Sequence, residues 1–71
     1  MKLLKEAKAK KFSTECYVKL HYDEETKHYS VYANNSNFNW GHSAFYDSLE
    51  EAEKDFYDTI NLYDFYEWEV K

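Results

Sequence analysis

The chain has 71 residues, with 14 acidic against nine basic residues and a formal charge of -5. This length supports one domain, residues 1–71, around a single small core. One glycine, one cysteine and no proline exclude a glycine-rich phosphate loop and an internal disulfide framework. Because no apolar run is long enough to span a membrane and no signal-peptide pattern is present, we expect a cytoplasmic, intracellular protein.

Residues 2–11 consist of good helix formers, with Leu3, Leu4 and Ala7 at helical spacing. This pattern predicts a short amphipathic helix. A flexible basic arm is the alternative, because a helix of this length is marginal unless its apolar side packs on something.

Residues 15–22 and 28–33 alternate between apolar and polar side chains, which predicts two strands. The segment between them fits a hairpin turn in which Asp23 accepts backbone hydrogen bonds and Lys27 takes a positive φ. Such a turn aligns the apolar residues of both strands on one face. The predicted pairs are Tyr22 with Tyr29, Leu20 with Val31 and Val18 with Ala33.

A third strand is predicted over residues 38–46, because most of the large side chains there fall on alternate residues and so on one face of a strand. Gly41 within it indicates a bulge or a close backbone approach.

A helix is predicted over residues 48–62. It begins with a capping box, in which the Ser48 hydroxyl accepts from the Glu51 N–H. Its apolar stripe follows helical spacing. The stripe consists of Leu49, Ala52, Phe56, Ile60 and Tyr63.

Residues 65–70 alternate again, which predicts a fourth strand, with a continuation of the helix as the alternative. The expected fold class is therefore α+β. It is a single small domain with an antiparallel sheet of three to four strands packed by helix 48–62.

Motifs for catalysis or metal binding are sparse. The one thiol, Cys16, falls on the apolar strand face, where burial raises the pKa of a thiol and makes it unreactive. His21 and His28 flank the hairpin turn, but two side chains do not make a zinc site, which needs three or four ligands. We therefore expect no catalytic residues, no metal, no cofactor and no enzyme activity.

The charge is divided between the two parts of the chain. Residues 1–20 carry +4 and residues 21–71 carry -9. The predicted element order resembles that of a double-stranded-RNA-binding domain, but the acidic second helix would repel phosphates. The absence of arginine also removes the bidentate fork that reads phosphate or guanine. Direct nucleic-acid binding is therefore disfavoured, and a small nucleic-acid-binding domain that uses the lysine-rich start of the chain stays as an alternative.

Acidic and aromatic residues are interleaved in the last third of the chain. An acidic surface accelerates encounter with a basic partner, and large exposed rings often anchor protein contacts. We therefore predict a partner-binding face in this part of the chain. It consists of Glu50, Glu51, Asp55, Tyr57, Asp58, Tyr63, Tyr66, Glu67, Trp68 and Glu69.

In size, net charge and element order, the chain resembles the small acidic inhibitors encoded by phages and other mobile elements, such as anti-CRISPR and antirestriction proteins. The resemblance rests on the surface acids of residues 50–69 and on no sequence motif. It implies a non-enzymatic inhibitor that docks a basic surface of a host nuclease or other DNA-binding protein, in some cases as a DNA mimic. A structural or oligomerising module is a further alternative, and the sequence predicts no oligomeric state.

Overall fold

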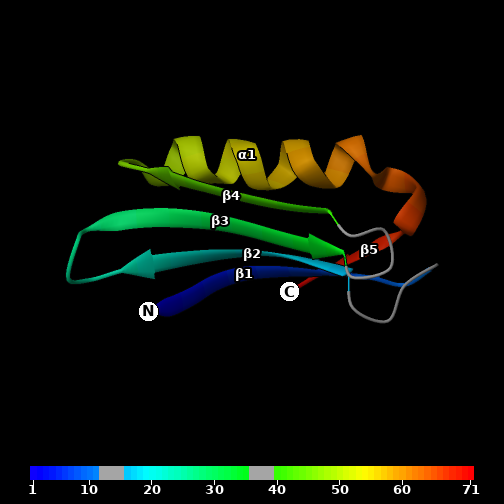
Figure 1. Ribbon diagram of the computed structural model, residues 1–71, viewed down its shortest axis with the longest axis horizontal. Helices are drawn as coiled ribbons and strands as arrows, with labels where there is room; N and C mark the ends of the chain where they lie inside the picture. Colours follow the sequence, from blue (N-terminus) through cyan, green and yellow to red (C-terminus); the bar gives the residue numbers. More distant parts are fainter. Residues whose placement is uncertain (12–15, 36–39) are drawn as a thin grey trace.

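The computed structural model of the chain describes residues 1–11, 16–35 and 40–71. Over these residues the chain forms five strands, one α-helix and one short 3₁₀ helix (Figure 1). In chain order they are β1 (Lys2–Ala9), β2 (Cys16–Asp23), β3 (His28–Asn35), β4 (Trp40–Tyr46), α1 (Leu49–Leu62), η1 (Asp64–Tyr66) and β5 (Trp68–Val70).

The strands form one antiparallel sheet in the order β4-β3-β2-β1-β5, and α1 lies along one side of it (Figure 1). The α+β class is therefore confirmed, with five strands in place of the three or four expected. Among the described residues, no helix lies on the opposite face, which we call the open face. Neighbouring strand residues consequently point alternately towards α1 and towards the open face.

The hairpin of β2 and β3 has the predicted register, with Leu20 opposite Val31 and both neighbouring pairs as expected. The Asp23 carboxylate accepts from the Glu25 N–H at 2.9 Å, and the Asp23 carbonyl accepts from the Lys27 N–H at 2.8 Å. Lys27 has φ 59°, as the turn geometry predicts. Strand β4 begins at Trp40 within the described residues, so the expected start at residues 38 and 39 lies outside them.

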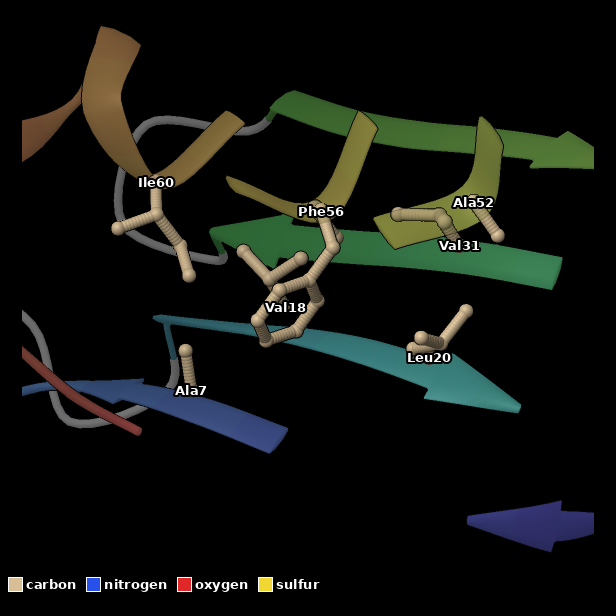
Figure 2. Close-up of a cluster of buried hydrophobic side chains, with 8 residues drawn as sticks. Ala7, Val18, Leu20, Val31, Ala52, Phe56 and Ile60 are labelled. Carbon is tan, nitrogen blue, oxygen red and sulfur yellow. The ribbon is translucent and has the colours of Figure 1, made fainter. Parts of the chain in front are cut away.

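The core lies between the sheet and α1, as Figure 2 shows. Phe56 is fully buried at the centre of the helix, because Ala52, Phe56 and Ile60 of the predicted apolar stripe face the sheet. The first member of the stripe, Leu49, is 39% exposed. Ser48 caps the helix by accepting from the Glu51 N–H at 3.2 Å, so the predicted start is confirmed. The buried core side chains are Ala7, Val18, Leu20, Val31, Ala33, Ala52, Phe56 and Ile60.

The predicted N-terminal helix over residues 2–11 is wrong, because this segment forms strand β1. β1 pairs with β2 on one side and with β5 on the other, and a register shift between Leu3 and Lys5 accommodates Leu4. Ala7 is fully buried opposite Val18. Helix propensity differs by only a few tenths of a kcal/mol per residue, and pairing the outer backbone groups of β2 outweighs it.

The segment 65–70 is a strand only from Trp68 onward. Before it, η1 turns the chain and Glu67 adopts a left-handed conformation with φ 55°. This turn brings β5 antiparallel to β1, with Lys8 opposite Glu69.

In the described part of the chain, no helix is long and apolar enough to cross a membrane.

Candidate functional site

Three acids of the predicted partner-binding face, Glu51, Asp55 and Asp58, follow one another along α1, and this acidic stripe lies beside the edge strand β4. One hollow of about 270 Å³ is lined by Tyr46, Glu51, Lys54, Asp55 and Asp58. A second hollow of about 330 Å³ shares Asp55 and Asp58 and extends along His42, Thr59 and Tyr63. Because the two hollows share these carboxylates, we treat them as one feature, the α1–β4 groove.

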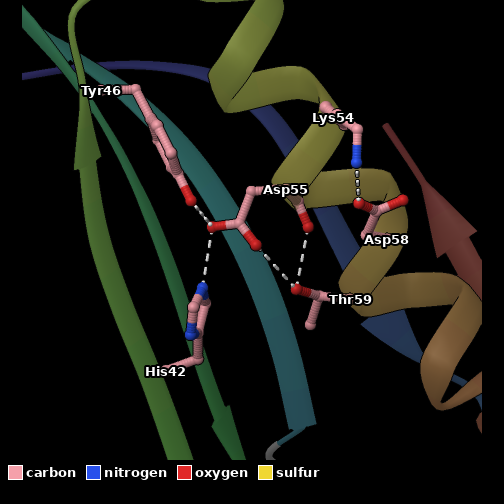
Figure 3. Close-up of polar contacts among 6 residues, drawn as sticks. All are labelled: His42, Tyr46, Lys54, Asp55, Asp58 and Thr59. Carbon is pink, nitrogen blue, oxygen red and sulfur yellow. Dashed lines mark hydrogen bonds and ion pairs between the residues drawn. The ribbon is translucent and has the colours of Figure 1, made fainter.

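Asp55 is the centre of the polar contacts in this groove (Figure 3). Its Oδ2 accepts from the Tyr46 hydroxyl at 2.8 Å and lies 2.8 Å from His42 Nε2. The Thr59 hydroxyl donates to the Asp55 carbonyl at 2.9 Å. With its side chain only 16% exposed, Asp55 therefore joins α1 to β4, which is a structural role that its place in the stripe did not predict.

The acids in the groove act on the phenol of Tyr46. The hydrogen bond to Asp55 raises the pKa of Tyr46 above 10, and burial and the charges of Asp55, Glu51 and Asp58 add to the shift. Tyr46 therefore stays protonated at neutral pH and keeps donating to Asp55.

The two other acids that line the groove, Glu51 and Asp58, are more exposed than Asp55. Asp58 pairs with Lys54 at 2.8 Å. Among the described residues, neither Glu50 nor Glu51 has an ion-pair partner. The outer side of α1 therefore presents two carboxylates close to the helix start, with Asp58 two turns further along.

Of the aromatic residues predicted at the site, Tyr57 is the most accessible, at 40% exposure. Its hydroxyl accepts from Lys5 Nζ at 2.9 Å, and the ammonium also lies 5.0 Å from the ring centroid. Lys5 in turn pairs with Glu53 at 3.1 Å. Tyr57 therefore lies on the β1 side of α1, away from the β4 edge, and its contacts hold β1 to the helix.

Tyr66 and Trp68 serve the fold and not a surface. Tyr66 is 2% exposed, and its hydroxyl lies 2.6 Å from the Asn35 amide nitrogen, which donates to it inside the protein. The Trp68 indole N–H donates to the Tyr63 carbonyl at 3.0 Å, and its ring packs against Tyr66 with 5.7 Å between centroids. These rings fasten the last strand to the end of the helix.

Glu67 and Glu69 lie at the other edge of the sheet, in and beside β5. Glu67 pairs with Lys11, and Glu69 approaches Lys71 at 4.0 Å. The predicted partner-binding face is therefore divided. Glu51, Asp55, Asp58 and Tyr63 line the α1–β4 groove, whereas Glu67 and Glu69 lie four strands away.

The lysines of the first segment are largely engaged within the molecule. Lys8 and Lys19 approach the Glu6 carboxylate at 3.6 and 3.7 Å. Lys5 pairs with the helix and Lys11 with Glu67. Lys5 and Lys11 therefore pair with acids from the remainder of the chain, whereas Lys8 and Lys19 share one acid of their own segment.

Phe45 and Tyr32 belong to a surface that was not predicted as a site. On the open face, Phe45 is 69% exposed, and a hollow of about 230 Å³ lies between Met1, His21, Tyr32 and Phe45. The sequence contains a signal for this surface, because Tyr32 and Phe45 occupy strand positions that alternate with the core-facing residues.

The chemical groups considered for catalysis or metal binding lie apart. Cys16 is buried, and burial raises the pKa of its thiol, as its place on the apolar face predicts. His28 pairs with Asp47 at 2.9 Å, whereas His21 lines the hollow on the open face. Within residues 1–11, 16–35 and 40–71, no group of three or more histidine, cysteine or acidic side chains could hold a metal ion.

Comparison with protein-family models, with curated proteins and with solved structures found no match to this chain. The geometry of the groove and of the strand beside it is therefore the basis for the functional argument.

Proposed function

We propose that the chain is a non-enzymatic protein-binding module that docks a basic protein surface with the α1–β4 groove and the adjoining outer side of α1. One observation carries the proposal. Glu51, Asp55 and Asp58 converge on a groove beside an open sheet edge, and Lys54 is the one lysine in its lining. A concave acidic surface attracts a cationic partner and speeds its encounter.

The basic partner that fits this surface best is a nucleic-acid-binding protein. Its cleft is cationic because it neutralises phosphates, and carboxylates on a rigid helix can occupy the same positions. On this proposal the chain is an inhibitor that competes with DNA for a host nuclease or other DNA-binding protein. Of the aromatic residues predicted at the site, Tyr63 contributes to the groove, whereas Tyr66 and Trp68 fasten the last strand to the end of the helix.

The test is a charge reversal that leaves the fold intact. The double variant Glu51→Lys and Asp58→Lys changes the exposed acids and spares Asp55, which holds α1 to β4. The matched control, Glu24→Lys and Glu25→Lys, makes the same change of net charge in the exposed hairpin turn. Binding to a panel of purified basic nucleases and DNA-binding proteins is measured at several salt concentrations, with duplex DNA as competitor.

We expect at least one member of the panel to bind with an affinity that falls as salt rises and to be displaced by DNA. The groove variant should bind at least about tenfold more weakly than the control, since each exposed charge contributes little alone but several act together. Equal losses in both variants would leave only non-specific attraction. A panel without any binding member would contradict the proposal itself.

A further inference from the structure

Strand β4 is an open edge of the sheet. Over the described residues, no strand pairs with its outer side, and its register with β3 runs without interruption over Trp40–Tyr46. An open edge presents a row of unpaired N–H and C=O groups, which proteins usually protect with charged side chains, proline or bulges. The β4 sequence WGHSAFY contains neither lysine, acid nor proline.

On the helix side, this edge adjoins the α1–β4 groove, which is lined by the acids Glu51, Asp55 and Asp58. On the open face, Phe45 of β4 is 69% exposed and, with Tyr32, lines a mainly apolar hollow that extends inward across the sheet to His21 and Met1. Because side chains alternate along a strand, a strand added to β4 would place every second side chain in an acidic setting and the others in an apolar one.

We propose that β4 is a strand-addition site that takes an extended segment of the partner protein in which lysine or arginine alternates with apolar residues. This inference rests on the proposed function, because it names the part of the basic partner that the groove receives. The main-chain groups of β4 supply the hydrogen bonds, as in other cases of β-augmentation. The acids select the basic side chains, and Phe45 provides a cross-strand contact for the apolar ones.

The charge of the groove also explains why the occupant is a partner and not a second copy of this chain. Two copies joined by antiparallel β4 edges are related by a twofold axis normal to the sheet, which puts both helices on the same face. The acidic stripes of the two helices would then face each other across the joint. Like charges so placed disfavour the pair, whereas a basic segment relieves the same field.

The experiment uses the full chain and two synthetic peptides of equal composition. One alternates lysine with valine, and the other arranges lysines and valines in pairs, so both carry the same charge. Binding is measured by titration, and backbone amide signals of β4 are followed by NMR. We expect the alternating peptide to bind about tenfold or more tightly than the paired one and to shift the amides of β4.

N-methylated versions of the alternating peptide test the main-chain contacts. In a strand, the N–H groups of all lysines point to one edge and those of all valines to the other. Methylation of one set should therefore abolish binding, whereas methylation of the other set should preserve it. Equal binding of both methylated peptides would overturn strand addition.

The side-chain contact is tested by Phe45→Ala, with Val70→Ala on the opposite edge strand as the matched control. We expect Phe45→Ala to weaken binding of the alternating peptide by about two- to fivefold and the control to leave it unchanged.

If both peptides bind equally and lose affinity in the Glu51 and Asp58 charge reversal, the proposed function stands and strand addition is wrong. If the alternating peptide binds and shifts β4, but no basic protein of the panel binds, strand addition stands and the proposed docking of a nuclease is wrong. If neither peptide nor protein binds, both are wrong. A twofold increase of solution mass without peptide would favour pairing of two copies and overturn the choice of occupant.

Discussion

The two edges of the sheet are built in opposite ways. The β5 edge is three residues long, and its neighbours include ion pairs such as Glu67 with Lys11. The β4 edge is seven residues long and contains no lysine, arginine, aspartate or glutamate. Short, charged edges resist pairing with another chain, whereas long uncharged edges favour it. In the described residues, the β5 edge therefore has the features that oppose strand pairing, whereas the β4 edge lacks them.

The same classes of residue have different roles at the two edges. At β5, Tyr66 is buried and accepts a hydrogen bond from Asn35, and Trp68 is fastened to the end of α1. At β4, Phe45 is exposed beside a hollow, and acids line the opposite face. An excess of rings and carboxylates does not by itself mark a binding surface, because their position relative to the core decides their role.

The largest expected effect is a difference in the free energy of unfolding between a variant near the β5 edge and a variant in the β4 edge. Replacing buried Tyr66 with alanine should lower the free energy of unfolding by about 3–5 kcal/mol, because it empties a large buried site. Phe45→Ala should change it by no more than about 0.5 kcal/mol, since the side chain is mostly in water. Urea denaturation measures both. A large loss for Phe45→Ala would mean that the β4 edge belongs to the core.

If Tyr66→Ala does not fold, Tyr66→Phe gives the same comparison on a smaller scale. It keeps the ring and removes the hydroxyl that accepts from Asn35 at 2.6 Å. We expect a loss of about 1–3 kcal/mol in the free energy of unfolding, because a buried amide N–H loses this acceptor.

A second prediction concerns how the open edge is held to the helix. Asp55→Ala removes the acceptor of Tyr46 and the contact with His42, and it should cost about 1–3 kcal/mol in the free energy of unfolding. The neighbouring variant Asp58→Ala should cost no more than about 0.5 kcal/mol, because Asp58 is exposed and pairs only at the surface. Equal losses would contradict the structural role of Asp55. Chemical denaturation of the two variants side by side checks this.

Local sequence signals predicted the parts of the fold that depend on neighbouring residues. The hairpin register followed from matched apolar faces, and the positive φ of Lys27 followed from the length of the turn. The start of α1 followed from Ser48 and Glu51, whose contact is local. In each case the interacting groups lie close together in the sequence, so one window of residues contains the whole signal.

The errors concern elements whose structure depends on distant residues. Residues 2–11 have the composition of a helix and become a strand because β2 and β5 both pair with them. Tyr66 and Trp68 would lie on the same face of one continuous strand. Instead η1 interrupts the alternation at Tyr66, and Asn35 holds the Tyr66 hydroxyl in the interior. The division of the candidate site has the same origin, since the strand order that separates β4 from β5 was not predictable without β1.

A third prediction uses pH to probe the contact between Tyr46 and Asp55. The pKa of Tyr46 is raised in the folded protein from its ordinary value of 10, so the native state holds this proton more tightly than the unfolded chain. The resulting stability is fully present below pH 10 and is lost as pH rises through the folded pKa. The stability difference between the natural chain and Tyr46→Phe should therefore shrink above pH 10. Urea unfolding across this range measures it.

The control for this pH dependence is the same pair of chains in the Asp55→Ala background. The hydrogen bond to Asp55 is the largest cause of the raised pKa of Tyr46, so its removal should abolish most of the difference in slope. A slope that persists without Asp55 would assign the shift to burial and to the charges of Glu51 and Asp58.

Lys54→Met should have the smallest effect on stability. It is also the sharpest test of how the open edge selects a partner. Lys54 is exposed and pairs with Asp58, and this contact raises the pKa of the Lys54 ammonium and keeps it charged. Because the pair lies at the surface, removing the ammonium should hardly alter the free energy of unfolding. It removes the one lysine from the groove lining and should tighten binding of the alternating lysine–valine peptide, with a steeper salt dependence. The matched control is Lys27→Met, which makes the same change of net charge in the hairpin turn. Equal gains in both variants would mean that the peptide responds to the total charge of the molecule, whereas a gain confined to Lys54→Met places the basic side chains of the partner in the groove beside β4.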